Sequence, residues 1–217
     1  MPSDKPVVHV IDDDEAMRES LAFLLSAVGM EVRTYDSALG FLDVAPNAEA
    51  GCVITDVRMP GLSGVDLLRR LRELKLGIPV IVITGHGDVP LAVEAMKIGA
   101  LDFLEKPFDD EVLLASVRSA LNQLNQDQKR QAERNEIERR LAALSNRERD
   151  VLEGLVSGQA NKQIAYDLGI SPRTIEIYRA NLMTKMQAAS LSDLVRMALI
   201  AGILGPESER PKTRDDA

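Results

Sequence analysis

Side chains that could handle a phosphoryl group follow four short apolar runs in the first half of the chain. They are Asp12, Asp13 and Asp14 after Val7–Ile11, Asp56 after Cys52–Thr55, Thr84 at the end of Val80–Thr84, and Lys106 just after Asp102–Leu104. Neighbouring carboxylates repel one another unless a cation intervenes, and their oxygens suit Mg²⁺, which keeps waters and phosphate oxygens as further ligands. An ammonium and a hydroxyl can hold the remaining phosphate oxygens. The set predicts phosphoryl chemistry on an aspartate.

The elements that must position these side chains alternate regularly. Strands are predicted at residues 7–11, 31–34, 52–55, 80–84 and 102–104, and helices at about 16–28, 38–44, 64–75, 90–98 and 109–123. Such alternation implies right-handed crossovers and a parallel sheet covered on both faces. We therefore predict a five-stranded, doubly wound α/β domain. The carboxyl ends of its strands share one edge, where ligands bind in this architecture.

Each of these side chains also has an ordinary structural explanation. The three aspartates could cap a helix, Thr84 could simply end a strand, and Lys106 before Pro107 could be a solvated loop charge. All of these explanations would have to coincide at one edge of one sheet. His9 and His86 show no comparable convergence and are interpreted as structural.

The charge of the chain is unevenly distributed. The 217 residues carry a formal net charge of −8, and residues 1–124 hold 11 basic and 20 acidic side chains, whereas residues 141–217 hold 10 of each. The acidic first part suits a cation site better than a nucleic-acid surface. No apolar run approaches the roughly 20 residues of a membrane span, and the N-terminus lacks a signal-peptide pattern. A cytoplasmic protein without a membrane partner is expected.

The second half of the chain predicts a small helical domain. Residues 124–141 are mostly polar and contain no Gly or Pro, which favours a semi-rigid helical linker. Ser145 and Glu148 have the spacing of a capping box, Asn161 is expected to cap the next helix, and Ser171 precedes a proline at a helix start. The first helix is predicted from the capping box at Ser145 to about residue 156. Further helices are predicted at about 162–168, 172–186 and 191–201, with a turn at Gly169. The middle pair forms a helix-turn-helix, and residues 205–217 read as a disordered tail.

The second motif helix has an apolar face and a polar face. The predicted inward face carries Ile175, Tyr178, Leu182 and Met186, and the predicted outward face carries Arg173, Glu176, Ile177, Ala180 and Thr184. A net charge near zero in this region speaks against DNA binding, because phosphate contacts normally dominate affinity. Individual cations near the motif helices could still contact DNA phosphates. Those on or beside the two helices are Lys162, Arg173, Arg179 and Lys185.

Residues 7–123 resemble the receiver domain of two-component response regulators. The motifs are Val-Ile-Asp-Asp-Asp, Asp-Val-Arg-Met-Pro-Gly-Leu-Ser-Gly, Ile-Thr-Gly-His-Gly-Asp and Phe-Leu-Glu-Lys-Pro-Phe, in family order. The resemblance implies that Asp56 accepts a phosphoryl group. It implies that Asp13, Asp56 and the backbone carbonyl of Arg58 bind Mg²⁺, with Asp12 acting largely through water. It further implies a switch pair, Thr84 and Phe103, and a Lys106 that pairs with the phosphoryl group beside a cis bond to Pro107.

The second half resembles the LuxR-type four-helix DNA-binding domain. The motifs are Leu-Ser-Asn-Arg-Glu-Arg-Asp-Val-Leu, Gly-Gln-Ala-Asn-Lys-Gln-Ile-Ala and Ile-Ser-Pro-Arg-Thr-Ile-Glu. Together the two halves resemble the NarL/FixJ family of response regulators, nearest to its FixJ branch. The resemblance implies base contacts from Glu176, Ile177 and Ala180, and phosphate contacts from Lys162, Thr174, Arg179 and Lys185. Many relatives have lysine at position 176, whereas glutamate accepts a hydrogen bond from cytosine, so the DNA site should differ there.

These resemblances imply a regulator of transcription rather than an enzyme. The expected domains are a receiver at 1–123, a linker at 124–141, a DNA-binding domain at 142–204 and a tail at 205–217. A sensor histidine kinase would phosphorylate Asp56 with Mg²⁺, and the resulting homodimer would bind double-stranded DNA at half-sites about one turn apart and activate RNA polymerase. One alternative is a DNA-binding protein whose receiver works without phosphorylation. Another is an aspartyl-phosphate phosphotransferase, although Arg58 stands where haloacid-dehalogenase-type enzymes carry a second acid.

Overall fold

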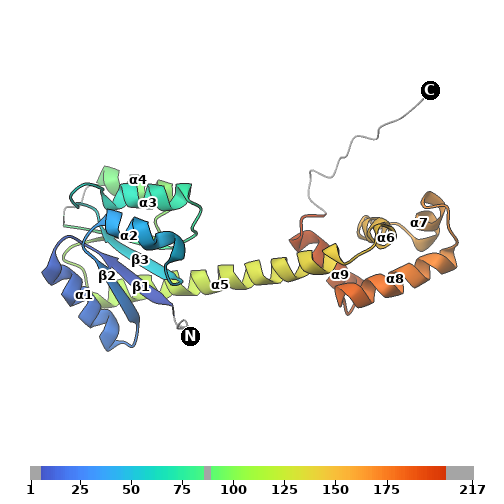
Figure 1. Ribbon diagram of the computed structural model, residues 1–217, viewed down its shortest axis with the longest axis horizontal. Coiled ribbons are helices and arrows are strands. Elements are labelled where there is room, and N and C mark those ends of the chain that lie inside the picture. The colour runs from blue at the N-terminus through green and yellow to red at the C-terminus, as the bar shows by residue number, and fades with distance from the viewer. Residues whose placement is uncertain (1–5, 86–88, 204–217) are drawn as a thin grey trace, which may run out of the picture. The chain divides into compact units, whose positions relative to one another are not determined.

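The computed structural model describes residues 6–85 and 89–203 of the chain (Figure 1). The tail predicted at 205–217 and His86 lie outside the described residues. Contacts divide the chain into two units, Met1–Gln128 and Lys129–Ala217. Neither unit contains a described helix that is both long and apolar enough to cross a membrane.

Within its described residues, the first unit contains a five-stranded parallel sheet in the order β2-β1-β3-β4-β5. The strands are β1 (Val7–Ile11), β2 (Glu31–Tyr35), β3 (Gly51–Asp56), β4 (Val80–Thr84) and β5 (Asp102–Glu105). The three central strands, β1, β3 and β4, are buried along their whole length, and β1 and β4 are accordingly rich in Val and Ile. The doubly wound α/β prediction is confirmed.

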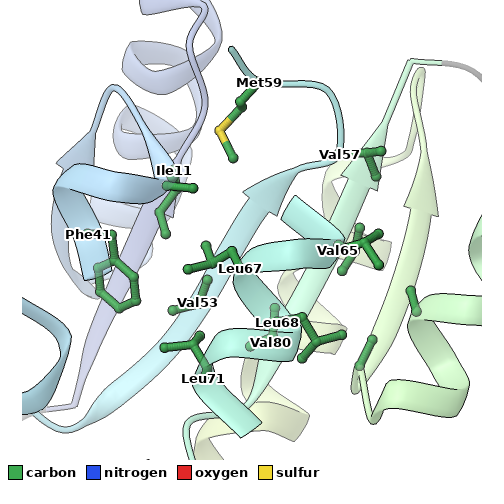
Figure 2. Packing of buried hydrophobic residues seen from close by; sticks show 14 of the residues in the cluster. Ile11, Phe41, Val53, Val57, Met59, Val65, Leu67, Leu68, Leu71 and Val80 are labelled. Atoms are coloured by element: carbon green, nitrogen blue, oxygen red, sulfur yellow. The ribbon is translucent and has the colours of Figure 1, made fainter. Parts of the chain in front are cut away.

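Helices cover both faces of this sheet and give it two apolar clusters. The helices are α1 (Glu15–Ala27), α2 (Ala38–Val44), α3 (Gly64–Glu73), α4 (Val89–Ile98) and α5 (Asp110–Ala142), with a 3₁₀ turn, η1, at Ala45–Asn47. One face is covered by α2, α3 and α4, and Figure 2 shows Phe41, Leu67 and Leu71 directed toward Val53 of β3. On the other face, α1 and α5 pack against residues such as Ile54. Val53 and Ile54 serve opposite clusters because successive strand residues point to opposite faces.

The turn after β3 requires a glycine at its far end. The Gly64 N–H donates to the Val57 carbonyl at 3.0 Å, and Gly64 begins α3, which Ser63 caps by accepting from the Asp66 N–H. A β-carbon on Gly64 would lie 2.1 Å from the Asp56 carbonyl oxygen and 3.0 Å from the Thr55 hydroxyl oxygen. The close approach of α3 to β3 therefore fixes the loop that follows Asp56.

The second unit is a helical bundle around one apolar cluster. Its helices after α5 are α6 (Asn146–Val156), α7 (Asn161–Asp167), α8 (Pro172–Met186) and α9 (Leu191–Ile200). Ile164, Ile175, Leu182 and Leu194 lie in the shared core. Gly169, with φ of 65°, makes the turn between α7 and α8, as the sequence predicts.

The predicted helix starts in this unit are confirmed with one exception. Ser145 and Glu148 form the capping box, and the Ser171 hydroxyl accepts from the Thr174 N–H at the start of α8. The prediction that Asn161 caps α7 is wrong. Ala160 occupies the capping position with an extended backbone and no side-chain bond, so Asn161 is already the first helical residue.

Helix α5 is longer than the helix predicted at 109–123. It continues without interruption to Ala142, so the polar stretch predicted to be helical is part of it. This stretch consists of good helix formers, and side chains four residues apart pair along it, as in Gln131–Asn135 and Arg134–Glu138. The division between the two units falls inside this helix.

The change Gly64→Ala is expected to destabilise the first unit by about 1–3 kcal/mol, because the new methyl group collides with backbone rather than with a flexible side chain. Urea unfolding followed by circular dichroism measures the effect. Gly85→Ala is the matched control, since a β-carbon there meets no atom of the described residues within 4 Å. Equal unfolding midpoints for both variants would contradict this account of the turn.

Candidate functional site

Three of the predicted side chains meet at the carboxyl edge of the sheet. Asp12 follows β1, Asp56 ends β3 and Lys106 follows β5. The Lys106 Nζ atom lies 2.8 Å from Asp56 Oδ1 and 3.1 Å from Asp12 Oδ2. Both aspartates are almost fully buried, with Asp56 8% exposed and Asp12 2% exposed. One ammonium group therefore joins two buried carboxylates that are 44 positions apart in the sequence.

Backbone groups orient each carboxylate. Asp56 Oδ2 accepts from the Arg58 N–H at 2.6 Å, and Asp12 Oδ1 accepts from the Asp14 N–H at 2.9 Å. Asp14 itself caps α1, accepting from the Ala16 N–H at 2.9 Å. The helix-capping explanation therefore holds for Asp14 but not for Asp12, which points to Lys106. Asp13, the middle residue of the three, is exposed.

Lys106 is held in place through its backbone as well as its side chain. Its N–H donates to the Thr84 carbonyl at 2.7 Å, and the peptide bond to Pro107 is cis, as expected. Burial opposes its charge, but hydrogen bonds from the ammonium to Asp56 and Asp12, and the charges of both, raise the pKa of Lys106 above its ordinary value. The group is therefore a cation at neutral pH.

The donor set fits a hard divalent cation. One ammonium balances only one of the two buried carboxylates, and Asp13, the residue after Asp12, is exposed. In the described part of the chain, no three His, Cys, Asp or Glu side chains converge as a metal cluster. Mg²⁺ binds through one or two carboxylates and completes its shell with other oxygens, so the buried pair Asp12 and Asp56 fits it. Asp12, Asp13, Asp56 and the Arg58 carbonyl are the ligands that the sequence predicts for such an ion.

Thr84 and Phe103 point to the same side of the sheet. Thr84 is 1% exposed at the end of β4 and pairs in register with Glu105 of β5. Phe103 lies two residues before Glu105, so the alternation of the strand gives both side chains one face. Phe103 is half-buried and packs against the cluster beneath α3 and α4. The two side chains therefore share the face of the sheet that α3 and α4 cover.

A cavity of ≈ 580 Å³ opens beside Lys106, between α1 and the turn that leads into α5. Its lining is largely apolar and includes Leu24, Pro107 and Phe108. Phe23 on α1 contributes as well, although its side chain is 79% exposed.

The predicted inner and outer faces of α8 are confirmed. Ile175, Leu182 and Met186 are buried, and Tyr178 is half-buried against the same cluster. The predicted DNA-contacting residues are distributed as follows: Arg173, Glu176, Ile177, Ala180 and Lys185 are exposed on α8, Thr174 and Arg179 are half-buried there, and Lys162 is exposed on α7. Ile177 is apolar but exposed and is not part of the core, which is consistent with an external contact.

Comparison with known families covers both units. Residues 8–118 match the response regulator receiver domain, and residues 142–198 match the bacterial regulatory proteins of the luxR family. The chain belongs to the response regulators that carry a LuxR-type DNA-binding domain. As a member of this family it is a transcription regulator rather than an enzyme. Its two domains imply a sensor kinase and DNA as partners.

Named relatives place this response regulator among FixJ-like proteins. It is 58% identical over 211 residues to the transcriptional regulatory protein FixJ of Azorhizobium caulinodans, covering 97% of this chain and 100% of the relative. Identity to FixJ of Bradyrhizobium diazoefficiens is 56%, covering 91% and 96%. Among solved structures, the response regulator StyR matches with a TM-score of 0.80 at 40% identity, covering 90% of this chain and 98% of StyR. Full-length FixJ from B. japonicum matches with a TM-score of 0.58 at 56% identity, covering 92% and 98%.

Lys185 of this regulator already has a partner within its own unit. Its Nζ atom lies 2.7 Å from Glu148 Oε2 and also donates to the Ala143 carbonyl at 3.4 Å. The same Glu148 oxygen accepts from the Ser145 N–H at 2.8 Å, and Glu148 is only 4% exposed. The ammonium of Lys185 and the Ser145 N–H lower the pKa of Glu148 below its ordinary value of 4.5. The sequence contained a capping-box signal for Glu148 but none for its pairing with Lys185.

Glu148→Gln is expected to lower the urea midpoint of the second unit at pH 7, because the amide loses the ion pair with Lys185. Since the pKa of Glu148 is depressed on folding, its contribution is complete above about pH 4.5 and is lost as the pH falls through the folded-state pKa. The difference from the wild type should therefore shrink below that pH. Glu153→Gln, an exposed change on the same helix, is the control, and a difference that stays constant with pH would contradict the pairing.

Proposed function

We propose that a sensor histidine kinase switches this regulator by transferring a phosphoryl group to Asp56 with Mg²⁺, and that the phosphorylated form dimerises and activates transcription. The observation that carries the proposal is the Lys106 ammonium, which lies between Asp12 and Asp56 at the strand ends. A structural ion pair alone would not need two buried carboxylates on one lysine.

The chemistry follows from the contacts of Asp56. A carboxylate oxygen attacks phosphorus, the bond from phosphorus to the kinase histidine breaks, and an aspartyl phosphate forms. Receiver domains generally bind Mg²⁺, which neutralises charge on the transferring oxygens. The Arg58 N–H holds one oxygen of Asp56 in place, and Lys106 exchanges its contact with the other for a contact with the phosphoryl group. Thr84 lies at the neighbouring strand end, within the same edge, and its hydroxyl is suited to donate to a phosphoryl oxygen.

The cavity beside Lys106 supports the kinase as a partner. A phosphodonor must bring its histidine to Asp56 from the open edge of the sheet, where Phe23 and Phe108 offer apolar contact. Apolar anchors near the reacting atoms would position the donor without consuming the charges that handle the phosphoryl group.

The surface of α4 supports the homodimer. Val89, Val93 and Met96 are 72%, 46% and 49% exposed and recur at helical spacing, so they form an apolar stripe. Helix α4 packs over the face to which Thr84 and Phe103 point. Movement of this pair on phosphorylation would change the stripe, and burial of the stripe in a second copy would favour a dimer.

The exposed side of α8 supports DNA contact. Glu176, Ile177 and Ala180 would face base edges in the major groove, while Lys162, Arg173, Thr174 and Arg179 would approach phosphates. A dimer would place two such helices on paired half-sites and present them beside RNA polymerase at a promoter.

Incubation with acetyl phosphate and Mg²⁺ is expected to add one phosphoryl group to the wild type and none to Asp56→Asn, because the amide is not a nucleophile. Intact mass spectrometry detects the adduct, and light scattering on the same samples detects the dimer. Asp43→Asn, an exposed change on α2, is the control and should be modified like the wild type. An adduct on Asp56→Asn would place the acceptor elsewhere, and unchanged DNA binding by that variant would favour a phosphorylation-independent receiver.

Glu176→Lys is expected to change the preferred base at one position of each half-site from cytosine to guanine. Glutamate accepts from the cytosine amino group, whereas lysine donates to guanine acceptors, and a good contact discriminates by about 1–3 kcal/mol. Selection from randomised duplexes followed by sequencing measures the preference. Glu153→Lys makes the same charge change on α6 and should leave the selected sequence unaltered, and an unchanged preference in Glu176→Lys would remove this residue from the base-reading set.

A further inference from the structure

The last turns of α5 belong to the core of the second unit. Ile137 is 3% exposed and lies in the same cluster as Ile175 and Leu182 of α8. Leu141, one turn later, packs against that cluster as well. Glu133 on α5 pairs with Arg196 of α9 at 2.6 Å. These residues precede position 142, where the match to the luxR family begins, so the packed unit extends beyond the family match.

Arg140 on α5 bonds directly to the end of α8. Its Nη1 atom donates to the Met186 carbonyl at 2.9 Å, and its Nε atom donates to Glu136 Oε1 at 2.9 Å. Met186 is the last residue of α8, and carbonyls at a helix end have no partner within the helix. A cation there also interacts favourably with the helix dipole. The Arg140 side chain is only 19% exposed, whereas that of its neighbour Arg139 is 73% exposed.

A second set of bonds runs in the opposite direction. Lys185, the residue before Met186, donates to the Ala143 carbonyl just after α5, and Arg149 of α6 donates to the Leu141 carbonyl at 3.2 Å. The ends of α5 and α8 are therefore joined reciprocally, each cation bonding to a carbonyl at or beside the end of the other helix. This connection, made of Arg140, Lys185 and the two carbonyls they reach, is called here the α5–α8 clasp.

We propose that Arg140 is a positioning residue for DNA recognition, which fixes the C-terminal end of α8 and so sets how its outer face meets the groove. Lys185 belongs to the same clasp and acts in it rather than as a phosphate contact. This inference rests on the proposed role of α8 in DNA binding and assigns a recognition function to the end of α5, a helix that begins in the receiver.

The contacts of Arg140 distinguish this role from direct binding of phosphate. Its guanidinium is mostly buried and already donates to a carbonyl and a carboxylate. A residue that neutralised a phosphate would contribute to the salt dependence of binding, by about 0.9 in the slope of log affinity against log salt. A positioning residue would leave that slope unchanged and lower the ratio of specific to non-specific affinity.

The test uses the full chain and a duplex selected from random sequences by the wild type, with a scrambled duplex for non-specific binding. Arg140→Met keeps the apolar stem and should weaken binding to the selected duplex by about tenfold, the equivalent of one charged hydrogen bond. Its salt slope and its affinity for the scrambled duplex should match the wild type. Arg140→Lys, which retains a cationic donor, should recover most of the loss. Arg139→Met removes the neighbouring charge and a pair with the same Glu136, and should bind as the wild type does.

Three results would overturn the proposal. Wild-type affinity of Arg140→Met for the selected duplex would show that the clasp does not affect recognition. A smaller salt slope would make Arg140 a phosphate contact, and equal losses on both duplexes would show a general effect on binding. If Arg140→Met does not fold, Glu136→Gln loosens the same guanidinium from a half-buried position. It should give a smaller specific loss that Arg139→Met does not share. Failure of the wild type to select any duplex would instead refute DNA binding itself.

Discussion

Two carboxylates at the edge of a buried sheet would repel each other if the ammonium of Lys106 did not lie between them. Asp12 and Asp56 end adjacent strands, whereas Lys106 follows a strand two places further along the sheet. Its side chain must therefore reach back across the end of β4, which requires the backbone after β5 to be held close to the end of β4. The bond from the Lys106 N–H to the Thr84 carbonyl holds it there. The register of β3, β4 and β5 thus becomes a condition for charge balance at the edge, and the apolar clusters on both faces hold the register.

The parts of this arrangement that follow from local patterns could be predicted from the sequence. Short runs of three to five residues, alternating with amphipathic segments, define the sheet, and the rule that parallel strands end on one edge brings Asp12, Asp56 and Lys106 together. The capping box at Ser145 and Glu148 and the outer face of α8 also follow from spacing alone. Each of these signals lies within one helix, strand or turn.

The parts that depend on contacts between distant segments could not be predicted. Arg140 and Met186 are 46 residues apart, and nothing in either local pattern indicates that one cation reaches the other's carbonyl. Lys185 has the position and charge expected of a phosphate contact, and only the fold reveals that it faces the buried Glu148. The end of α5 could not be predicted for another reason. A polar run of good helix formers contains no stop signal, so only tertiary contacts such as that of Ile137 show how far the helix extends. The error at Asn161 was a shift of one residue, within the usual scatter of helix ends.

The charges of the second unit are used largely for internal structure. Arg140, Arg149 and Lys185 donate to carbonyls or to a buried carboxylate. Of the four cations on the motif helices, this leaves Lys162, Arg173 and Arg179 to face DNA. With a balance of 10 basic and 10 acidic side chains in residues 141–217, one copy would gain little from phosphate contacts. Pairing two copies converts the second contact into an intramolecular one and raises the effective concentration. If the receivers pair as proposed, a second unit with so few phosphate contacts would bind DNA mainly as part of that pair.

The continuity of α5 also determines where this protein can be cut and rejoined. Regulators of this kind invite the construction of chimeras in which one receiver is exchanged for another, and residue 142, where the match to the luxR family begins, is the obvious junction. A junction there would replace Ile137, Arg140 and Leu141 with foreign residues and remove part of the core beneath α8. A junction before Lys129, where the contacts themselves divide, would keep the packed unit whole. The modular boundary visible in sequence families and the physical boundary of the folded unit are thus more than ten residues apart.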